Sequence, residues 1–310
     1  MNTCKICGNT ENNEYFVVKE MMFGTRDKFT YMKCADCGCL QLINIPNDMS
    51  KYYPSENYYS YHSKAKEVGK LKKTLRKIFI FCYNHNLVPL CGQNYNFETL
   101  KSLKIKFSSS ILDIGCGNGK LIKILSRYGY EKATGIDPFI ENDTDDGIVK
   151  IFKTDVCNFS TKCSESKKTF DLIMLHHSFE HIENQHETME AIHKLLSPDG
   201  FLLVRIPVCD CLAFRKYKEN WFQIDAPRHF FLHSLKSMSF LAKTHNFSLK
   251  KIFYDSDLNQ IIMSEKYCQD ITLRENYEIS AKRIKNLNKF VEFLNDIGDG
   301  DQACFILKKK

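Results

Sequence analysis

Proline and tryptophan are scarce in this sequence, which has seven prolines and one tryptophan in 310 residues. Few prolines, together with 43% hydrophobic residues, exclude a proline-rich disordered chain and predict a globular protein with a sizeable core. No apolar run is long enough to cross a bilayer, and Ile78-Phe79-Ile80-Phe81 is far too short. The first residues, Met-Asn-Thr-Cys, lack the basic and then apolar pattern of a secretion signal.

The missing secretion signal bears on the fourteen cysteines. Disulfides persist in oxidising compartments, so these thiols are expected to be reduced or bound to metal. The expected location is the cytoplasm.

Two Cys-x-x-Cys-Gly turns lie near the N-terminus, at residues 4–8 and 34–38. The two cysteine pairs are separated by 26 residues, and two such pairs are typical of a zinc site. Four thiolates close a tetrahedron, so the sequence predicts structural Zn²⁺ in a zinc ribbon, with these ligands: Cys4, Cys7, Cys34 and Cys37. Cys39 is expected to be a bystander, although it could replace Cys37. A redox dithiol fits poorly because there are two pairs.

A glycine-rich turn follows a short apolar run at residues 111–119, which read Ile-Leu-Asp-Ile-Gly-Cys-Gly-Asn-Gly. The run predicts a buried strand, and the apolar spacing after Gly119 predicts a helix. Glycines let a ligand approach the main chain closely, and the start of a helix offers unpaired N–H groups. Open α/β sheets bind nucleotide-like ligands at such turns. Cys116, inside the turn, is expected to be a small filler rather than a nucleophile.

Further strands are predicted along the chain, at residues 133–137, 148–154, 170–175, 200–206, 247–254 and 301–308. Asp137 ends the first of these and is placed to accept hydrogen bonds from ribose hydroxyls. Asp155 and Val156 end the next one and could hold an adenine ring. A helix is expected before residues 197–200, whose Ser-Pro-Asp-Gly should stop it. Strands alternating with helices predict a parallel sheet covered on both faces.

These features together resemble the class I S-adenosylmethionine-dependent methyltransferases. The resemblance rests on the glycine turn with its leading acid, on Asp137, on Asp155-Val156 and on Leu-Leu-Ser-Pro-Asp-Gly-Phe-Leu at 195–202. It covers about residues 96–255 plus the C-terminus. It implies an α/β fold with a Rossmann-like seven-stranded methyltransferase sheet, S-adenosylmethionine as cofactor, and these cofactor-binding residues: Asp113, Gly115, Cys116, Gly117, Gly119, Asp137, Asp155, Val156 and His176.

A dinucleotide-dependent oxidoreductase is the competing interpretation. The third glycine here comes two residues after the second, whereas the dinucleotide pattern needs three. Asp113 would also repel a pyrophosphate, while it suits a ligand with an α-amino group and a sulfonium. The methyltransferase interpretation is therefore favoured.

Three regions are expected in the chain: a zinc ribbon at 1–45, a tyrosine-rich linker with a basic amphipathic helix at 46–95, and the methyltransferase domain at 96–310. A helical insertion at about 256–299 should precede the last strand. The linker tyrosines either stack on sugar or base faces or pack the ribbon onto the next domain; they are Tyr52, Tyr53, Tyr58, Tyr59 and Tyr61.

The basic helix is expected within residues 64–83, with an apolar stripe that packs on a neighbouring domain: Val68, Leu71, Leu75, Ile78 and Cys82. The formal net charge is +7, and residues 51–110 hold eleven Lys or Arg against three acids. An anionic partner should therefore meet this segment.

Candidate catalytic residues follow the fourth and fifth predicted strands of the domain. In the resembling family, a Glu-His pair after the fourth strand faces the methyl group, which implies Glu180 and His181. Trp-x-x-x-Asp-x-Pro-Arg-His at 221–229 resembles a bacterial subgroup associated with sugar or lipopolysaccharide modification. Asp225 could orient His229 as a base, or Arg228 could pair with a substrate phosphate or carboxylate. Alternatively, Arg228 and Asp225 form a salt bridge and His229 caps the helix near Ser234.

The sequence thus predicts a methyltransferase that acts on a small anionic or sugar-linked acceptor, most simply a sugar hydroxyl or a carbon of a nucleotide-linked sugar in surface-polysaccharide biosynthesis. His229 or His181 would be the base. One alternative is an RNA methyltransferase that grips phosphates with its ribbon and basic helix. Another is a binding module that retains the cofactor without turnover.

Overall fold

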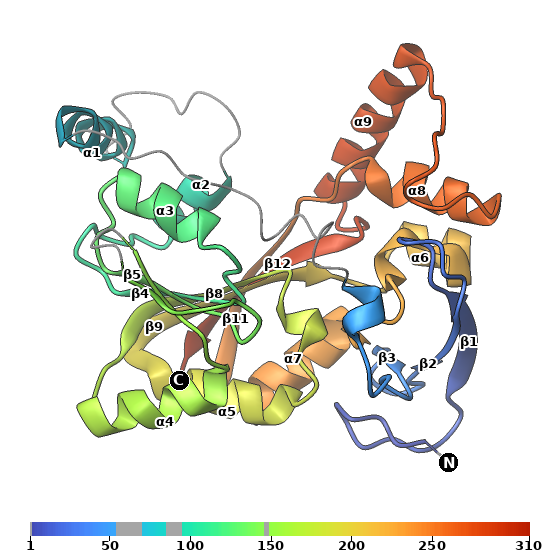
Figure 1. Cartoon of the computed structure of the whole chain (residues 1–310), viewed down its shortest axis with the longest axis horizontal. Helices are drawn as coiled ribbons and strands as arrows, with labels where there is room; N and C mark the ends of the chain where they lie inside the picture. The colour runs from blue at the N-terminus through green and yellow to red at the C-terminus, as the bar shows by residue number, and fades with distance from the viewer. Residues whose placement is uncertain (1, 54–69, 85–94, 146–148) are drawn as a thin grey trace. The chain divides into compact units, whose positions relative to one another are not determined.

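The computed structural model describes residues 2–53, 70–84, 95–145 and 149–310, and the chain forms two compact units. The ribbon unit comprises Met1–Pro54, His177–Met189 and Val204–Leu307. The glycine-turn unit comprises Ser55–His176, Glu190–Leu203 and Lys308–Lys310. Figure 1 shows the whole chain.

The glycine-turn unit is an α/β fold of the Rossmann-like type with a mainly parallel sheet. Its strands lie in the order β9-β8-β4-β5-β7-β6. β4 pairs in parallel with β5 and β8, and β5 pairs in parallel with β7, while the short β6 is antiparallel to β7. The bounds are β4 Ile111–Ile114, β5 Ala133–Ile136, β6 Thr144–Asp145, β7 Lys150–Phe152, β8 Phe170–His176 and β9 Leu196–Pro207.

Helices cover both faces of this sheet: α1, α2 and α3 lie on one face and α4 on the other (Figure 1). Their bounds are α1 Lys70–Asn84, α2 Tyr95–Ser102, α3 Lys120–Arg127 and α4 Val156–Ser166. β4 is buried along its whole length, because both of its faces are covered. α5 (Gln185–Leu195) begins in the ribbon unit and ends in this one.

Two residues of the predicted apolar stripe of the basic helix do not face inward, whereas Cys82 is half-buried as expected. Leu75 and Ile78 are exposed in α1, whereas Ile80 is fully buried. The guanidinium of Arg76 lies 5.4 Å from the ring centroid of Tyr128, so the inward face of α1 is rotated relative to the predicted one. Val68 lies outside the described residues.

The ribbon unit contains a four-stranded sheet in the order β1-β2-β3-β10. The strands β1 Glu14–Lys19, β2 Lys28–Lys33 and β3 Leu40–Leu42 form a meander, and β10 Phe231–Leu232 adds to β3 in antiparallel register. Residues almost 200 positions apart therefore share one small sheet.

The remaining elements of the ribbon unit surround a core that includes Trp221 and Phe214. Their bounds are η1 Ser50–Tyr52, η3 Phe179–His181, α6 Leu212–Tyr217, η4 Lys218–Asn220, η5 Phe222–Ile224, α7 Leu235–Thr244, β11 Phe247–Tyr254, α8 Asn259–Cys268, α9 Ala281–Asp296 and β12 Gln302–Lys309. β12 lies between β9 and β11. β9 passes from the glycine-turn unit into the ribbon unit after Leu203.

Strands form at each of the seven predicted places, and β6 is additional. One boundary differs clearly. Residues 197–200 were expected to form a turn, but β9 already begins at Leu196. Pro198 cannot continue the preceding helix, which ends at Leu195, and the Ser197 hydroxyl donates to Asp171 near the start of β8 at 3.4 Å. The chain thus enters the strand directly.

Among the helices that the structure describes, none has the length and apolar character needed to cross a membrane.

Candidate functional site

The glycine turn connects β4 to α3 in the glycine-turn unit. Gly119 has φ +72°, and a Cβ built on it would lie 2.2 Å from Cδ1 of Ile151. Both the backbone conformation and the close side chain therefore require glycine at this position. Gly115 and Gly117 also have positive φ, as the sharp turn predicted from the sequence requires.

Asp137 follows β5 and fixes the glycine turn from the side. Its carboxylate accepts hydrogen bonds from the Gly117 N–H at 2.9 Å and the Phe139 N–H at 2.8 Å. Each carboxylate oxygen has a second lone pair, so both can still accept a bond from a ligand hydroxyl. The acid therefore retains the hydrogen-bonding capacity that its predicted role requires.

Asp113 lies on β4, next to β5, and is almost completely buried. Burial and the nearby Asp137 raise its pKa to about 7. Two acids without a compensating cation are costly in this position. A ligand with an ammonium or sulfonium group would relieve that cost.

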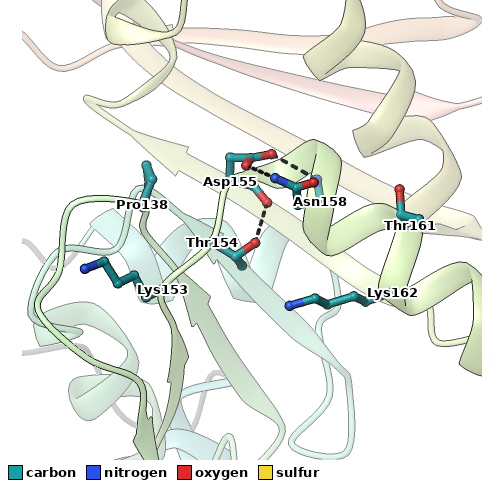
Figure 2. Close-up of a pocket in the computed structure, with 7 residues that line it drawn as sticks. All are labelled: Pro138, Lys153, Thr154, Asp155, Asn158, Thr161 and Lys162. Atoms are coloured by element: carbon teal, nitrogen blue, oxygen red, sulfur yellow. Dashed lines mark hydrogen bonds between the residues drawn. The ribbon is translucent and has the colours of Figure 1, made fainter.

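Asp155 caps α4, accepting from the Asn158 N–H at 2.9 Å, and Val156 is the buried first residue of the helix. A pocket of about 600 Å³ lies beside them, lined by Pro138, Lys153, Thr154, Asp155, Asn158, Thr161 and Lys162 (Figure 2). The pocket therefore extends from Pro138, the residue after Asp137, to Asp155, the residue expected at the adenine. His176, also expected near the cofactor, ends β8.

Cys116 is half-buried inside the glycine turn, and burial raises its pKa well above its usual value. A thiol that stays protonated is a poor nucleophile. The side chain faces Gly135, where an added Cβ would lie 2.5 Å from its sulfur. This is the environment of a packing residue.

The thiols of Cys4, Cys7, Cys34 and Cys37 converge in the ribbon unit. The Sγ atoms of Cys4 and Cys37 are 3.6 Å apart, and those of Cys7 and Cys34 are 3.5 Å apart. A tetrahedral ion with Zn–S bonds of about 2.3 Å needs sulfur atoms about 3.8 Å apart, so the set fits Zn²⁺. The sulfur of Cys39 lies outside this set, 3.9 Å from the Leu40 carbonyl oxygen.

A second convergence in the ribbon unit brings together Glu180, His181 and His229. Glu180 and His181 come from η3, and His229 comes from the loop before β10. Nε2 of His229 lies 4.0 Å from Glu180 Oε1 and 3.9 Å from Asp225 Oδ2. The four predicted catalytic residues are therefore neighbours.

Burial, with the nearby His181, lowers the pKa of His229 to about 4. The imidazole is therefore neutral near pH 7. Burial alone would raise the pKa of Glu180, but the facing His177 and the other imidazoles hold it at about 2. The cluster thus combines an ionised carboxylate with a neutral imidazole that can accept a proton.

The predicted orientation of His229 by Asp225 is wrong, because 3.9 Å is too long for a hydrogen bond. Nδ1 of His229 instead lies 2.7 Å from the Gln223 carbonyl oxygen. The alternative of a helix cap is also wrong, since Ser234 caps α7 itself through a capping box with Ser237.

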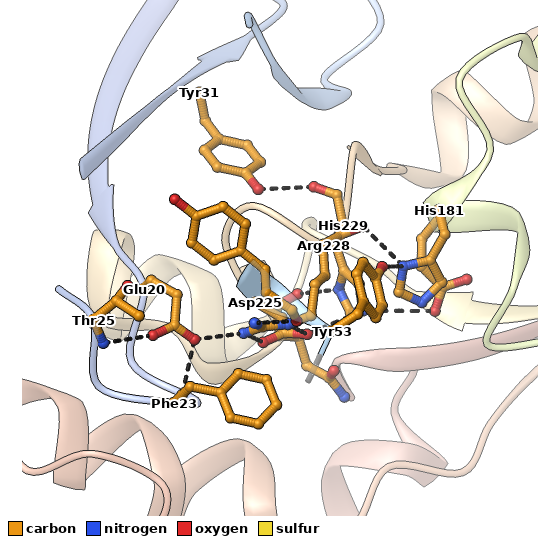
Figure 3. A network of polar contacts seen from close by, with 12 residues as sticks. Glu20, Phe23, Thr25, Tyr31, Tyr53, His181, Asp225, Arg228 and His229 are labelled. Carbon is orange, nitrogen blue, oxygen red and sulfur yellow. Dashed lines mark hydrogen bonds and ion pairs between the residues drawn. The ribbon is translucent and has the colours of Figure 1, made fainter. Parts of the chain in front are cut away.

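Arg228 does not face an open substrate site; it is buried in an ion-pair network (Figure 3). Its guanidinium donates to Asp225 at 2.6 and 2.9 Å, to Glu20 at 3.0 Å and to the Tyr52 carbonyl at 3.2 Å. Burial would raise the pKa of Asp225, but Arg228 keeps it below its usual value. The salt-bridge alternative for Asp225 and Arg228 is therefore the observed one, and pairing with a substrate anion is not supported.

His177 connects this cluster, through Arg205, to Asp255, whose role the sequence did not explain. Its Nδ1 lies 3.5 Å from Glu180 Oε1, and its Nε2 accepts from Arg205. Arg205 in turn donates to Asp255 at 2.6 Å. The backbone of His177 is left-handed, at φ +51°, which directs the ring back toward Glu180.

Two of the linker tyrosines lie within the described residues. The Tyr52 hydroxyl donates to Asp27 at 2.8 Å, and the Tyr53 hydroxyl lies 3.4 Å from Nδ1 of His181. These tyrosines therefore contact the ribbon unit itself. Tyr58, Tyr59 and Tyr61 lie outside the described residues.

Sequence reasoning missed Glu20, Tyr31 and the Gln223 carbonyl. Tyr31 donates its hydroxyl to the His229 carbonyl at 2.8 Å, and Glu20 is a fully buried partner of Arg228. Glu20 and Tyr31 come from the ribbon strands and their connecting loop, about 200 residues before their partners. No local pattern signals such pairs.

Comparison with known proteins gives a match to a family model described as a methyltransferase domain, over residues 83–252. The chain is 28% identical over 127 residues to the mitochondrial ubiquinone biosynthesis O-methyltransferase of Mus musculus, covering 38% of this chain and 32% of that protein. It is 32% identical over 128 residues to EEF1A lysine methyltransferase 2 of Homo sapiens, covering 36% and 53%. The chain thus spans about a third to a half of these relatives.

Among solved structures, the chain is similar to an S-adenosylmethionine-dependent methyltransferase from Archaeoglobus fulgidus. The identity is 19% and the TM-score 0.45, with 75% of this chain and 99% of that one covered.

Proposed function

Because the chain belongs to the methyltransferase domain family, we propose that it transfers the methyl group of S-adenosylmethionine to a small acceptor, most simply a sugar hydroxyl or a carbon of a nucleotide-linked sugar. The observation that carries the cofactor assignment is the buried pair Asp113 and Asp137. Burial and mutual repulsion leave Asp113 with a pKa of about 7, so the pair favours a cationic ligand.

The glycine-turn unit supplies the cofactor site in this proposal. The methionine end lies at the turn, with its cationic groups near Asp113. The ribose hydroxyls donate to Asp137, and the adenine lies by the pocket next to Asp155. The full set is Asp113, Gly115, Cys116, Gly117, Gly119, Asp137, Asp155, Val156 and His176.

The acceptor is activated by the cluster in the ribbon unit. An alcohol must lose its proton for transfer, and His229 or His181 takes it, assisted by Glu180. β8 ends at His176, only four residues before Glu180.

A sugar-linked acceptor is supported by the 221–229 motif and by the basic surplus of residues 51–110. The proposed organisation keeps a zinc ribbon at 1–45, a linker and basic helix at 46–95 and a methyltransferase domain at 96–310. The expected seven strands are joined by β6, so the sheet of that domain has eight strands among the described residues. The mouse relative is named an O-methyltransferase, which supports oxygen as the acceptor atom.

The test is methyl transfer by the purified full chain from labelled cofactor to nucleotide-linked sugars, free sugars and RNA. Transfer to a sugar is the expected result. Transfer only to RNA would reject the sugar assignment in favour of an RNA methyltransferase. Cofactor binding without transfer to any class would indicate a binding module.

The cofactor assignment has its own variant pair. Asp137→Asn should weaken cofactor binding in calorimetry roughly 10- to 100-fold, since hydrogen bonds to a charged group contribute about 1.5–3 kcal/mol each. Asp145→Asn changes an exposed acid of the same unit and should leave the affinity unchanged. Equal affinities in the two variants would contradict the assignment.

A structural Zn²⁺ at Cys4, Cys7, Cys34 and Cys37 completes the proposal, because the sulfur separations fit a tetrahedral ion. With Co²⁺ in its place, thiolate-to-metal charge-transfer absorption should be seen in the natural chain and in Cys39→Ser. Cys37→Ser should lose one thiolate from that spectrum and much of the ribbon stability. If Cys39→Ser changes the spectrum and Cys37→Ser does not, Cys39 is the fourth ligand in place of Cys37.

A further inference from the structure

The cluster of Glu180, His181 and His229 has a property that a proton-accepting role does not explain. Their ligand-type atoms all lie within 4.8 Å of one another. We propose that these three residues bind a divalent metal ion of the Zn²⁺ class, at a site separate from the four thiols. The site has two imidazole nitrogens and one carboxylate, and an open position remains for an acceptor oxygen.

Both histidines have their Nδ1 beside a main-chain carbonyl oxygen. Nδ1 of His181 lies 2.8 Å from the Arg228 carbonyl oxygen, and Nδ1 of His229 lies 2.7 Å from that of Gln223. A carbonyl oxygen only accepts, so each Nδ1 carries the hydrogen and donates it. The Nε2 lone pairs are left for the site. Metal-binding histidines are commonly held by such a bond from the other ring nitrogen.

Glu180 provides an independent indication of a missing cation. Both of its carboxylate oxygens are buried and make no hydrogen bond within the described part of the chain. Nδ1 of His177 lies 3.5 Å from Oε1. A buried carboxylate that accepts no hydrogen bond is costly, and the unprotonated nitrogens of the two nearby imidazoles increase the cost. A cation between these acceptors removes it.

The cluster is held by contacts that do not occupy its ligand atoms. The Phe230 N–H donates to the Glu180 main-chain carbonyl at 2.8 Å, and the Tyr31 hydroxyl donates to that of His229. Figure 3 shows His181 and His229 beside the Arg228 network, which anchors the loop that carries His229. These contacts therefore fix the positions of the ligand residues without using their ligand atoms, as supporting hydrogen bonds do in other metal sites.

The separations are slightly wide for an ion. Zn–N and Zn–O bonds of about 2.0–2.1 Å require neighbouring ligands about 3.4 Å apart in a tetrahedron. His229 Nε2 and Glu180 Oε1 are 4.0 Å apart. Binding must therefore draw these atoms together by about 0.6 Å, a shift that side-chain torsions can supply without moving the backbone.

This inference deepens the proposed function and rests on it only for the catalytic consequence. A hydroxyl bound to the ion loses its proton to solvent more easily, because the ion stabilises the anion. Its oxygen then forms the bond to the methyl carbon, and the electron pair of the broken S–C bond stays on sulfur. The ion would thus replace a free imidazole as the means of activating the acceptor.

The test is the Zn²⁺ content and affinity of the full-length protein, with neither cofactor nor acceptor present. The natural chain should bind two equivalents, one at the thiols and one at the cluster. Glu180→Gln and His229→Gln should each lower the affinity for the second equivalent at least 100-fold and retain the first. Glu183→Gln, an exposed acid three residues from Glu180, is the matched control and should bind both.

Substitution with Co²⁺ supplies a readout that needs no variant. Sulfur ligands alone give strong thiolate-to-metal absorption, so the second equivalent should add weak visible bands without increasing it. A single equivalent in the natural chain, or a second one that Glu180→Gln and His229→Gln leave unchanged, overturns the metal site. Cofactor binding and methyl transfer that persist in such a protein would leave the proposed function intact, with an imidazole as the base.

Discussion

Two buried charged clusters, the Arg228 network in the ribbon unit and the pair Asp113 and Asp137 in the glycine-turn unit, are compensated in opposite ways. In the ribbon unit, Arg228 is surrounded by Asp225, Glu20 and a carbonyl, so the guanidinium is fully engaged by the chain itself. In the glycine-turn unit, Asp113 and Asp137 lie close together, and neither has an ion-pair partner among the described residues. The Arg228 network stabilises the fold, whereas the acid pair is proposed to bind a cationic ligand. This contrast separates residues that stabilise the protein from those proposed to bind the cofactor.

The largest expected effect is on the engaged network. Arg228→Met removes the cation from two buried carboxylates, so the free energy of unfolding should fall by roughly 3–5 kcal/mol. Denaturant unfolding measures it. Arg215→Met is the matched control, because Arg215 pairs with Asp299 at an exposed surface and should cost about 1 kcal/mol or less. Equal losses in the two variants would contradict the role given to Arg228.

The pair Asp113 and Asp137 should have the opposite effect, because removing one of its charges is expected to stabilise the apoprotein. The pKa of Asp113 is raised in the folded state, so its stabilising contribution is complete below about pH 4 and is lost as pH rises through about 7. Asp113→Asn should therefore stabilise the apoprotein at pH 8, by up to about 4 kcal/mol, and have little effect at acidic pH.

The same variant should weaken cofactor binding, because it removes the charge that faces the ligand cation. Thermal unfolding at several pH values and calorimetry measure the two effects. Asp199→Asn, at an exposed acid of the same unit, should change neither. Asp301 of the ribbon unit also has a pKa of about 7, so it contributes to the pH dependence of stability in both proteins. The effect of Asp113 is therefore the difference in stability between Asp113→Asn and the natural chain at each pH. A less stable Asp113→Asn at pH 8 would remove the contrast between the units.

The smallest effect sharpens the comparison within the ribbon unit. Tyr31→Phe removes the hydroxyl that donates to the His229 carbonyl and should cost about 1 kcal/mol, the usual contribution of a buried hydrogen bond. Tyr15→Phe, at an exposed tyrosine of β1, should cost nothing measurable in the same denaturant experiment. A Tyr31→Phe protein as stable as the natural chain would show that this contact does not anchor the loop.

The sequence predicted best what is local. The glycine turn, the acid after β5 and the paired cysteines each depend on residues close together in the chain, and the structure places strands at all seven expected positions. Part of the face of α1 was predicted wrongly, because the apolar spacing in this helix did not reveal that Ile80 faces inward. Glu20 and Tyr31, which bind Arg228 and the His229 carbonyl, were missed because these contacts are set by tertiary packing between segments about 200 residues apart.

β10 begins two residues after His229 and pairs with β3, which follows the second cysteine turn. The position of this imidazole is therefore tied to the element that carries the four converging thiols, the proposed Zn²⁺ ligands. Metal starvation or oxidation of those thiols would be felt far along the chain, at the residue proposed to act on the acceptor. An enzyme arranged in this way would lose its activity together with its ribbon, even while the nucleotide-binding fold stayed intact.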